Sequence, residues 1–153
     1  DVQLKLNGAG VRNKFFLNLY VGSLYLEVPS HKGREVISAD EPMAIRLHIL
    51  SKLITSKKME EATREGFVQA TNGDIAPIQE RMEEFISLFK QEEIVTGDVF
   101  DFVYRPEEGL LAYKNEELMS TVKGLDFKKA LFAIWLGPDP VQESLKAKML
   151  GDG

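Results

Sequence analysis

The stretch LNGAGVRNKFFLNLYVGSLYLEV, residues 6–28, determines most of what the sequence says about the fold. Its second part, residues 14–28, is rich in aromatic and branched side chains and predicts a long β-strand. Its first part, Asn7 to Gly10, predicts a turn, because glycine adopts positive φ without steric cost. Arg12 stands between the two parts. Three interpretations of the segment are open: a phosphate-binding loop, a plain turn between strands, and an anion-binding pocket.

The phosphate-binding interpretation lacks its motif. The segment contains neither G-x-G-x-x-G nor G-K-[ST], and a strand rather than a helix is predicted after the glycines. A phosphate would therefore find no helix N-terminus to bind. A turn between two strands, followed by one cationic side chain, is what the sequence favours.

The remaining chain predicts a mixed α+β fold. Alternating apolar residues predict further strands over 2–6, 43–50, 98–106, 109–115 and 117–123. Helical spacing predicts a short helix within 31–40 and longer ones over 55–72, 74–89, 126–137 and 141–150. Strands and helices do not alternate regularly, so a large antiparallel sheet with helices packed against it is expected. At 153 residues, the chain is predicted to be a single domain over 1–153.

Composition excludes several classes of function. The net charge of −5 argues against nucleic acid as a partner and against broad electrostatic adhesion to anionic membranes. The absence of cysteine excludes disulfides and thiolate chemistry. His31 and His48 stand in no metal-ligand pattern, so no metal or cofactor is expected. No apolar run approaches the roughly 20 residues of a transmembrane helix, and no signal peptide is recognisable.

Arg12 and Tyr20 are the polar candidates for a site. Arg12 could simply extend its charge into water, or it could aim its N–H donors at a carboxylate or enolate in an apolar cleft. Tyr20 shares strand parity with Arg12, but eight residues of straight strand would separate the two by about 26 Å. They reach one small ligand only if the chain turns between them.

Two helical segments supply candidate apolar lining. Gly66 interrupts an otherwise good helix, either to allow tight packing or to leave room for a ligand beside Phe67. Ile134 and Trp135 end the predicted helix 126–137 and belong either to the core or to a pocket wall.

Taken in order, LNGAGVR, FFLNLYVGSLYLE, ITSKKMEEATREGF, ALFAIWLG and LKAKMLG resemble the bacterial branch of the chalcone isomerase-like family. The resemblance spans nearly the whole chain. It implies a large antiparallel sheet covered on one face by a layer of helices, with a ligand cleft between them. Relatives include plant chalcone isomerases and non-catalytic fatty-acid-binding proteins.

The resemblance also implies roles for single residues. The arginine matching Arg12 faces the ligand in both kinds of relative, and a tyrosine matching Tyr20 joins it in the fatty-acid binders. The isomerases also use a tyrosine, an asparagine and a hydroxyl residue, near the positions of Met59, Gly66 and Ile134 here. Only Arg12 matches the catalytic set, so the resemblance favours binding over isomerisation.

The expected function is therefore that of a non-catalytic carrier for an amphipathic, anionic hydrophobic ligand. A fatty acid is the first choice, and a flavonoid or a porphyrin is an alternative. Arg12 would pair with the anion and Tyr20 would donate a hydrogen bond, and the cleft would be lined by Phe16, Gly66, Phe67, Ile134 and Trp135. The rival hypotheses are a chalcone isomerase in which Arg12 stabilises an enolate or phenolate, and an interaction module with a filled core. By resemblance the protein is expected to be a periplasmic monomer.

Overall fold

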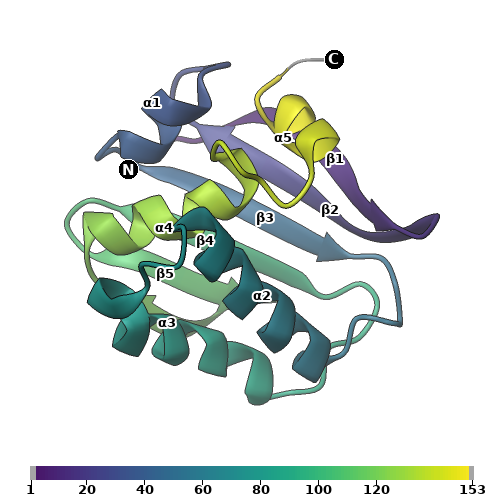
Figure 1. The fold of residues 1–153 in the computed structure, drawn as a ribbon. Coiled ribbons are helices and arrows are strands. Elements are labelled where there is room, and N and C mark those ends of the chain that lie inside the picture. Colours follow the sequence, from purple (N-terminus) through teal and green to yellow (C-terminus); the bar gives the residue numbers. More distant parts are fainter. Residues whose placement is uncertain (1–2, 152–153) are drawn as a thin grey trace.

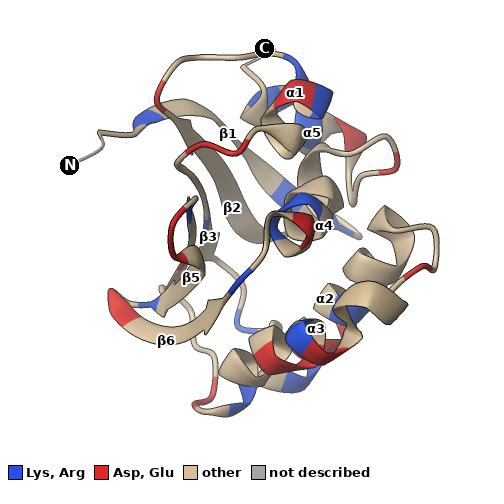
Figure 2. Ribbon diagram, turned by 90° about the vertical axis from the view of Figure 1, so that its left-hand side faces the viewer, with Lys and Arg blue, Asp and Glu red and all other residues tan. Residues whose placement is uncertain are grey.

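A computed structural model describes residues 3–151, in which six antiparallel strands form one open sheet. Sheet order equals sequence order: β1 (Lys5–Lys14), β2 (Leu17–Leu26), β3 (Met43–Ile49), β4 (Val99–Arg105), β5 (Gly109–Lys114) and β6 (Glu117–Val122). The helices are α1 (Gly33–Ser38), α2 (Ser56–Ala70), α3 (Gln79–Ile86), α4 (Leu125–Leu136) and α5 (Glu143–Met149), with 3₁₀ turns η1 (Ala76–Ile78) and η2 (Ser87–Lys90). They lie on one side of the sheet (Figures 1 and 2). The predicted α+β class is confirmed. Val2, where the first strand was expected to begin, lies outside the described residues.

The predicted turn at Asn7 to Gly10 is wrong. These residues lie inside β1, and the chain reverses at Phe15 and Phe16 instead. Their φ angles are 52° and 66°, and Lys14 pairs with Leu17 across the turn. Two successive positive φ angles define a type I′ hairpin, for which Asn-Gly is the preferred sequence. Left-handed backbone costs a non-glycine residue roughly 1–2 kcal/mol, which is why sequence patterns did not place the turn here.

The glycines of β1 and β2 make room for α5. A Cβ atom on Gly8 would lie 2.7 Å from the carbonyl oxygen of Met149, and one on Gly10 would lie 2.9 Å from the Cβ of Lys148. Gly22 on β2 faces the same helix, where a Cβ would touch Leu145 at 3.4 Å. The glycines therefore serve close packing of helix on sheet rather than a turn.

The core lies between the sheet and α2, α3 and α4. Phe67 of α2 is fully buried, with ring centroids 6.1 Å from Phe85 and 5.4 Å from Phe127. Phe85 in turn contacts Phe102 of β4 at 5.1 Å. These edge-to-face and tilted pairs join the helices to the sheet and add to the burial of their apolar surface.

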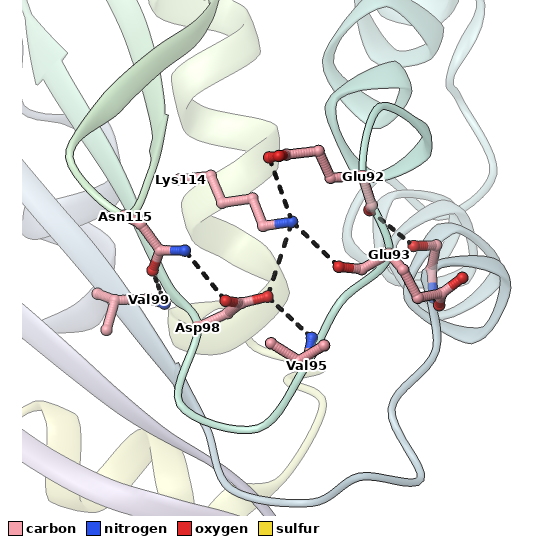
Figure 3. Close-up of polar contacts among 8 residues, drawn as sticks. Glu92, Glu93, Val95, Asp98, Val99, Lys114 and Asn115 are labelled. Atoms are coloured by element: carbon pink, nitrogen blue, oxygen red, sulfur yellow. Dashed lines mark hydrogen bonds and ion pairs between the residues drawn. The ribbon is translucent and has the colours of Figure 1, made fainter.

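A buried lysine ties the segment before β4 to the sheet (Figure 3). Lys114 of β5 is 5% exposed and forms ion pairs with Asp98 at 3.6 Å and with Glu92 at 3.7 Å. Asp98 also accepts hydrogen bonds from the Val95 backbone N–H and the Asn115 amide. Burial alone would raise the pKa of the Asp98 carboxyl group, but these hydrogen bonds and the charge of Lys114 outweigh it and lower the pKa. The network fixes residues 91–98 against the end of β5 and the start of β4.

A second buried lysine anchors α1 to α4. Lys128 is completely buried, and its Nζ atom donates to the carbonyl oxygens of Val36, Ile37 and Ala39 at 2.7–2.8 Å. These carbonyls belong to the last turn of α1, where the helix has no further N–H donors of its own. Burial lowers the pKa of Lys128 to about 8.

Candidate functional site

Arg12 and Tyr20 lie directly opposite each other on β1 and β2. The turn at Phe15–Phe16 reverses the chain between them, and the two residues are register partners. Opposed residues in an antiparallel pair have Cα atoms about 4.5–5.5 Å apart, instead of the 26 Å of a straight strand. The hairpin thus brings together the two polar residues that the sequence could pair only if the chain turned.

Gln142, at the start of α5, holds the Arg12 guanidinium. Arg12 Nη1 donates to the Gln142 side-chain oxygen at 3.1 Å and to the carbonyl of Asn13 at 3.0 Å. Gln142 is itself fixed, since its Nε2 donates to the Val11 carbonyl at 3.0 Å and its oxygen also accepts from the Asn13 N–H. Sequence reasoning missed Gln142, because it belongs to no motif and follows a proline-rich turn.

One edge of the Arg12 guanidinium is free. Its Nε and Nη2 atoms donate to no acceptor among the described residues. Arg46 uses this same edge to hold both oxygens of Asp101, at 2.7 and 3.3 Å, and Arg64 uses it to hold Glu83. Arg12 therefore presents the two-donor edge that binds carboxylates elsewhere in the same molecule.

Tyr20 is buried and neutral. Its hydroxyl oxygen accepts a hydrogen bond from Trp135 Nε1 of α4 at 3.0 Å. Burial raises the pKa of the Tyr20 phenol, so the group keeps its proton at neutral pH. No other hydrogen bond to this hydroxyl is found within residues 3–151.

A cavity of about 160 Å³ opens beside Arg12, between β1, α2 and α4. Its lining comprises Arg12, Ala62, Glu65, Gly66, Gln69, Ile134, Asp139 and Val141. The cavity is smaller than the roughly 300–1,000 Å³ of typical ligand pockets. One guanidinium and two exposed carboxylates therefore share a small space.

Gly66 allows α2 and α4 to approach each other at this cavity. A Cβ on Gly66 would lie 3.0 Å from Cγ2 of Ile134 and 3.2 Å from its Cδ1. The close-packing interpretation of Gly66 agrees with these distances, and Gly66 also lines the cavity, so room for a ligand beside it stays a prediction.

The remaining candidates lie elsewhere. Phe16 is at the hairpin tip, fully exposed, and Phe67 lies in the aromatic core. Trp135 is buried beside Tyr20 and Phe102, and neither Trp135 nor Tyr20 is part of the cavity lining. Of the predicted lining residues, the structure thus brings Gly66 and Ile134 to Arg12. Glu65 and Asp139 were not predicted, since a single carboxylate on a helix or in a turn carries no distinguishing pattern.

A larger hollow, of about 370 Å³, lies between the end of β2, α1 and the start of β3. Its lining includes Glu27, Glu35 and Glu41 and no lysine or arginine. An anionic ligand would meet only negative side chains there, so this hollow is a poorer candidate than the cavity at Arg12. Within residues 3–151 no helix is long and apolar enough to cross a bilayer, and no cluster of three potential metal ligands occurs.

Comparison with known proteins identifies the family and agrees with the fold. The family model described as chalcone isomerase-like matches residues 1–151. The chain belongs to the chalcone isomerase-like family. The resemblance drawn from the quoted motifs is confirmed.

Among solved structures, this family member is similar to a fatty-acid-binding protein of Arabidopsis thaliana. The TM-score is 0.76 at 18% sequence identity, and the match covers 96% of this chain and 86% of the other. At that identity the likeness shows the fold. No curated protein sequence matches the chain significantly.

Proposed function

We propose that this protein is a monomeric, non-catalytic binder of an amphipathic carboxylate such as a fatty acid. The observation that carries the proposal is the free Nε/Nη2 edge of Arg12 at the mouth of a cavity. A carboxylate there would accept two parallel hydrogen bonds, as Asp101 does from Arg46. The fatty-acid-binding function of a structural relative supports the same class of ligand.

The size of the cavity limits what it can hold. A volume of about 160 Å³ accommodates a head group and a few carbon atoms, but not a complete long-chain acid. The rest of the chain would pass between α2 and α4, where Gly66 contacts Ile134. We therefore expect binding of longer acids to require a shift of the Ile134 side chain.

The two carboxylates of the lining select the charge of the ligand. Glu65 and Asp139 share the cavity with Arg12, so a second negative charge on the ligand would be repelled at short range. A monocarboxylate carries one negative charge, which Arg12 can pair, and its apolar end would lie against Ile134 and Val141. Monocarboxylates should consequently bind better than dicarboxylates of the same length.

The isomerase hypothesis receives no comparable support. Glu65 and Asp139 are exposed to solvent, whereas the carboxyl group of a general acid typically lies in a buried site. The Tyr20 phenol is neutral because burial raises its pKa, so it is a poor base. A chalcone absorbance assay decides the point, since cyclisation above the buffer rate that Arg12→Gln abolishes would favour catalysis.

Binding can be tested through the chain's single tryptophan. Trp135 lies against Tyr20, so a ligand that accepts from the Tyr20 hydroxyl should change its fluorescence. Titrations with octanoate and dodecanoate should saturate, and Arg12→Gln should weaken binding by about tenfold or more, as expected for a charge-assisted pair.

The matched control is Arg46→Gln, which removes an arginine already engaged by Asp101. It should leave the affinity unchanged. Equal affinities of Arg12→Gln and wild-type protein would refute the role of Arg12. Octanedioate, a dicarboxylate, tests the charge selection and should bind more weakly than octanoate.

A further inference from the structure

The tip of the β1–β2 hairpin carries an unusual concentration of exposed apolar side chains. Phe15 is 82% exposed, Phe16 is 106% exposed, and Leu17 beside them is also exposed. Lys14 completes this four-residue segment, called the hairpin tip here, and its Nζ atom lies 5.7 Å from the ring centroid of Phe15. The tip projects beyond the helical layer at the right of Figure 1.

A second exposed apolar segment lies at the same end of the sheet. The turn after β3 is hydrogen-bonded to β2, since the N–H groups of Leu50 and Ser51 both donate to the Leu19 carbonyl. Leu50 and Leu53 of this turn are exposed. Figure 1 shows the turn and the hairpin tip on the same side of the molecule. The apolar surface thus extends from the tip onto its neighbour.

The backbone of the tip is less stable than an ordinary turn. Phe15 and Phe16 both have positive φ, where Asn-Gly would be free of strain. Core packing does not offset this strain, because both rings are exposed and neither belongs to the hydrophobic core. Backbone strain that no contact within the molecule offsets is typical of residues at functional sites, such as those that bind a partner.

The charge around the tip is positive although the whole chain carries −5. No acidic residue occurs in 2–26 or in 42–59, the segments that carry the hairpin tip and the turn after β3, whereas Asp98, Glu116 and Glu117 lie farther along this end of the sheet, at β4 to β6. Among the exposed lysines of these segments, Lys14 is in the tip, Lys52 precedes the exposed Leu53, and Lys57 and Lys58 are at the start of α2.

Glu61 of α2 is exposed, but three other acidic residues near the start of α2 are engaged, among them Glu60, which pairs with Lys90 at 3.8 Å. Glu92 pairs with Lys114, and Glu93 accepts from the Ser56 N–H. The net charge therefore excludes broad adhesion to anionic surfaces, but it does not describe this local patch.

We propose that the hairpin tip is a membrane contact that inserts Phe15 and Phe16 into an anionic lipid surface, with the flanking lysines on the head groups. A protein partner fits the shape less well. Two phenylalanine side chains bury about 400 Å² in total, below the roughly 800 Å² that each partner contributes to a stable protein interface. Interfacial binding needs only a few inserted apolar groups and adjacent cations. This inference does not depend on the ligand proposed for Arg12.

Vesicle flotation tests the proposal directly. Wild-type protein should float with vesicles of phosphatidylcholine and phosphatidylglycerol, and much less with phosphatidylcholine alone. The variant Phe15→Asn/Phe16→Gly restores the preferred type I′ sequence and should raise the melting temperature while lowering vesicle binding by about tenfold or more. A gain in stability with a loss of binding cannot result from misfolding.

Further variants separate the contributions. Val28→Asn/Val68→Asn alters two exposed valines outside the tip and should leave binding unchanged. Lys14→Gln/Lys52→Gln should weaken binding to anionic vesicles only, and in wild type added salt should do the same. A tryptophan introduced by Phe16→Trp should shift its emission to the blue on vesicle addition and be quenched by brominated lipid, against the background of the buried Trp135.

Three outcomes would overturn the proposal. Wild-type protein that stays unbound with anionic vesicles refutes it, and so does equal flotation of the Phe15→Asn/Phe16→Gly variant. Concentration-dependent self-association of wild type in sedimentation velocity, lost in the same variant without any lipid effect, would assign the tip to a second copy of this chain instead.

Discussion

The buried Lys128 predicts a specific dependence of stability on pH. Its pKa in the folded protein is about 8, lowered from 10.5 chiefly by burial. Between these values the unfolded chain binds more protons than the native protein, so the free energy of unfolding rises with pH. Integrating the two titrations from pH 8 to pH 10 gives an increase of about 2 kcal/mol.

The upper limit of this window is set by Tyr104. Its hydroxyl donates to Asp40 at 2.6 Å, and burial together with this bond raises its pKa to about 12. Above pH 10 the unfolded phenol loses its proton first, which makes the free energy of unfolding fall again. The contribution of Lys128 is therefore read most cleanly between pH 8 and 10.

Urea unfolding at closely spaced pH values measures the effect, with Lys128→Met as the perturbation. The variant removes the titrating group and should give a flat profile from pH 8 to 10. It should also be less stable, because three α1 carbonyls lose their donor at a cost of about 1–3 kcal/mol for a buried unsatisfied group.

The neighbouring Lys129 provides the control, since it is exposed and its replacement by Met should keep most of the slope. Parallel profiles of wild type and Lys128→Met would refute the reasoning. Such a result would mean that the three carbonyl oxygens keep the ammonium charged throughout the window.

Three further perturbations follow from the packing and the site. Gly8→Ala should destabilise the fold by about 2 kcal/mol in urea unfolding, because the added Cβ would clash with the backbone at Met149 and force α5 to move. A cost near zero would show that α5 does not pack tightly on β1. Gln142→Ala should weaken octanoate binding less than Arg12→Gln does, since Arg12 loses its anchor but keeps its charge. Asp98→Asn should be less stable than wild type at pH 7, and the difference should shrink as pH falls below about 4, because the lowered pKa of Asp98 stabilises the fold only while the carboxylate is ionised.

Local signals in the sequence predicted most of the architecture. Alternation placed β3 and the three strands from 99 to 122 within a few residues, and a hydroxyl N-cap placed α2, where Thr55 accepts from the Lys58 N–H. The resemblance to the family supplied the one-sided layer of helices. The strands and helix ends depend on neighbouring residues, which is why local patterns in the sequence predict them.

The hairpin could not be predicted, because its cause is not local. Glycines usually mark turns, but those of β1 are required by α5, more than 130 residues later in the chain. The true turn carries two phenylalanines, the opposite of its preferred sequence. Likewise, Gln142 became relevant only when α5 came to lie beside Arg12, a contact that no spacing in the sequence encodes.

The same two-residue turn now determines both proposed sites, and this allows them to be separated. The turn and the register shift between Arg12 and Asn13 together place Arg12 opposite Tyr20, so inserting a residue into the turn would disturb the ligand site and the tip together. Phe15→Asn/Phe16→Gly keeps the length and the type I′ geometry, and only the side chains change. That variant should therefore bind octanoate as wild type does while failing to float with vesicles. If it loses both, register rather than lipid contact is what the phenylalanines maintain, and the membrane proposal fails while the role of Arg12 stands.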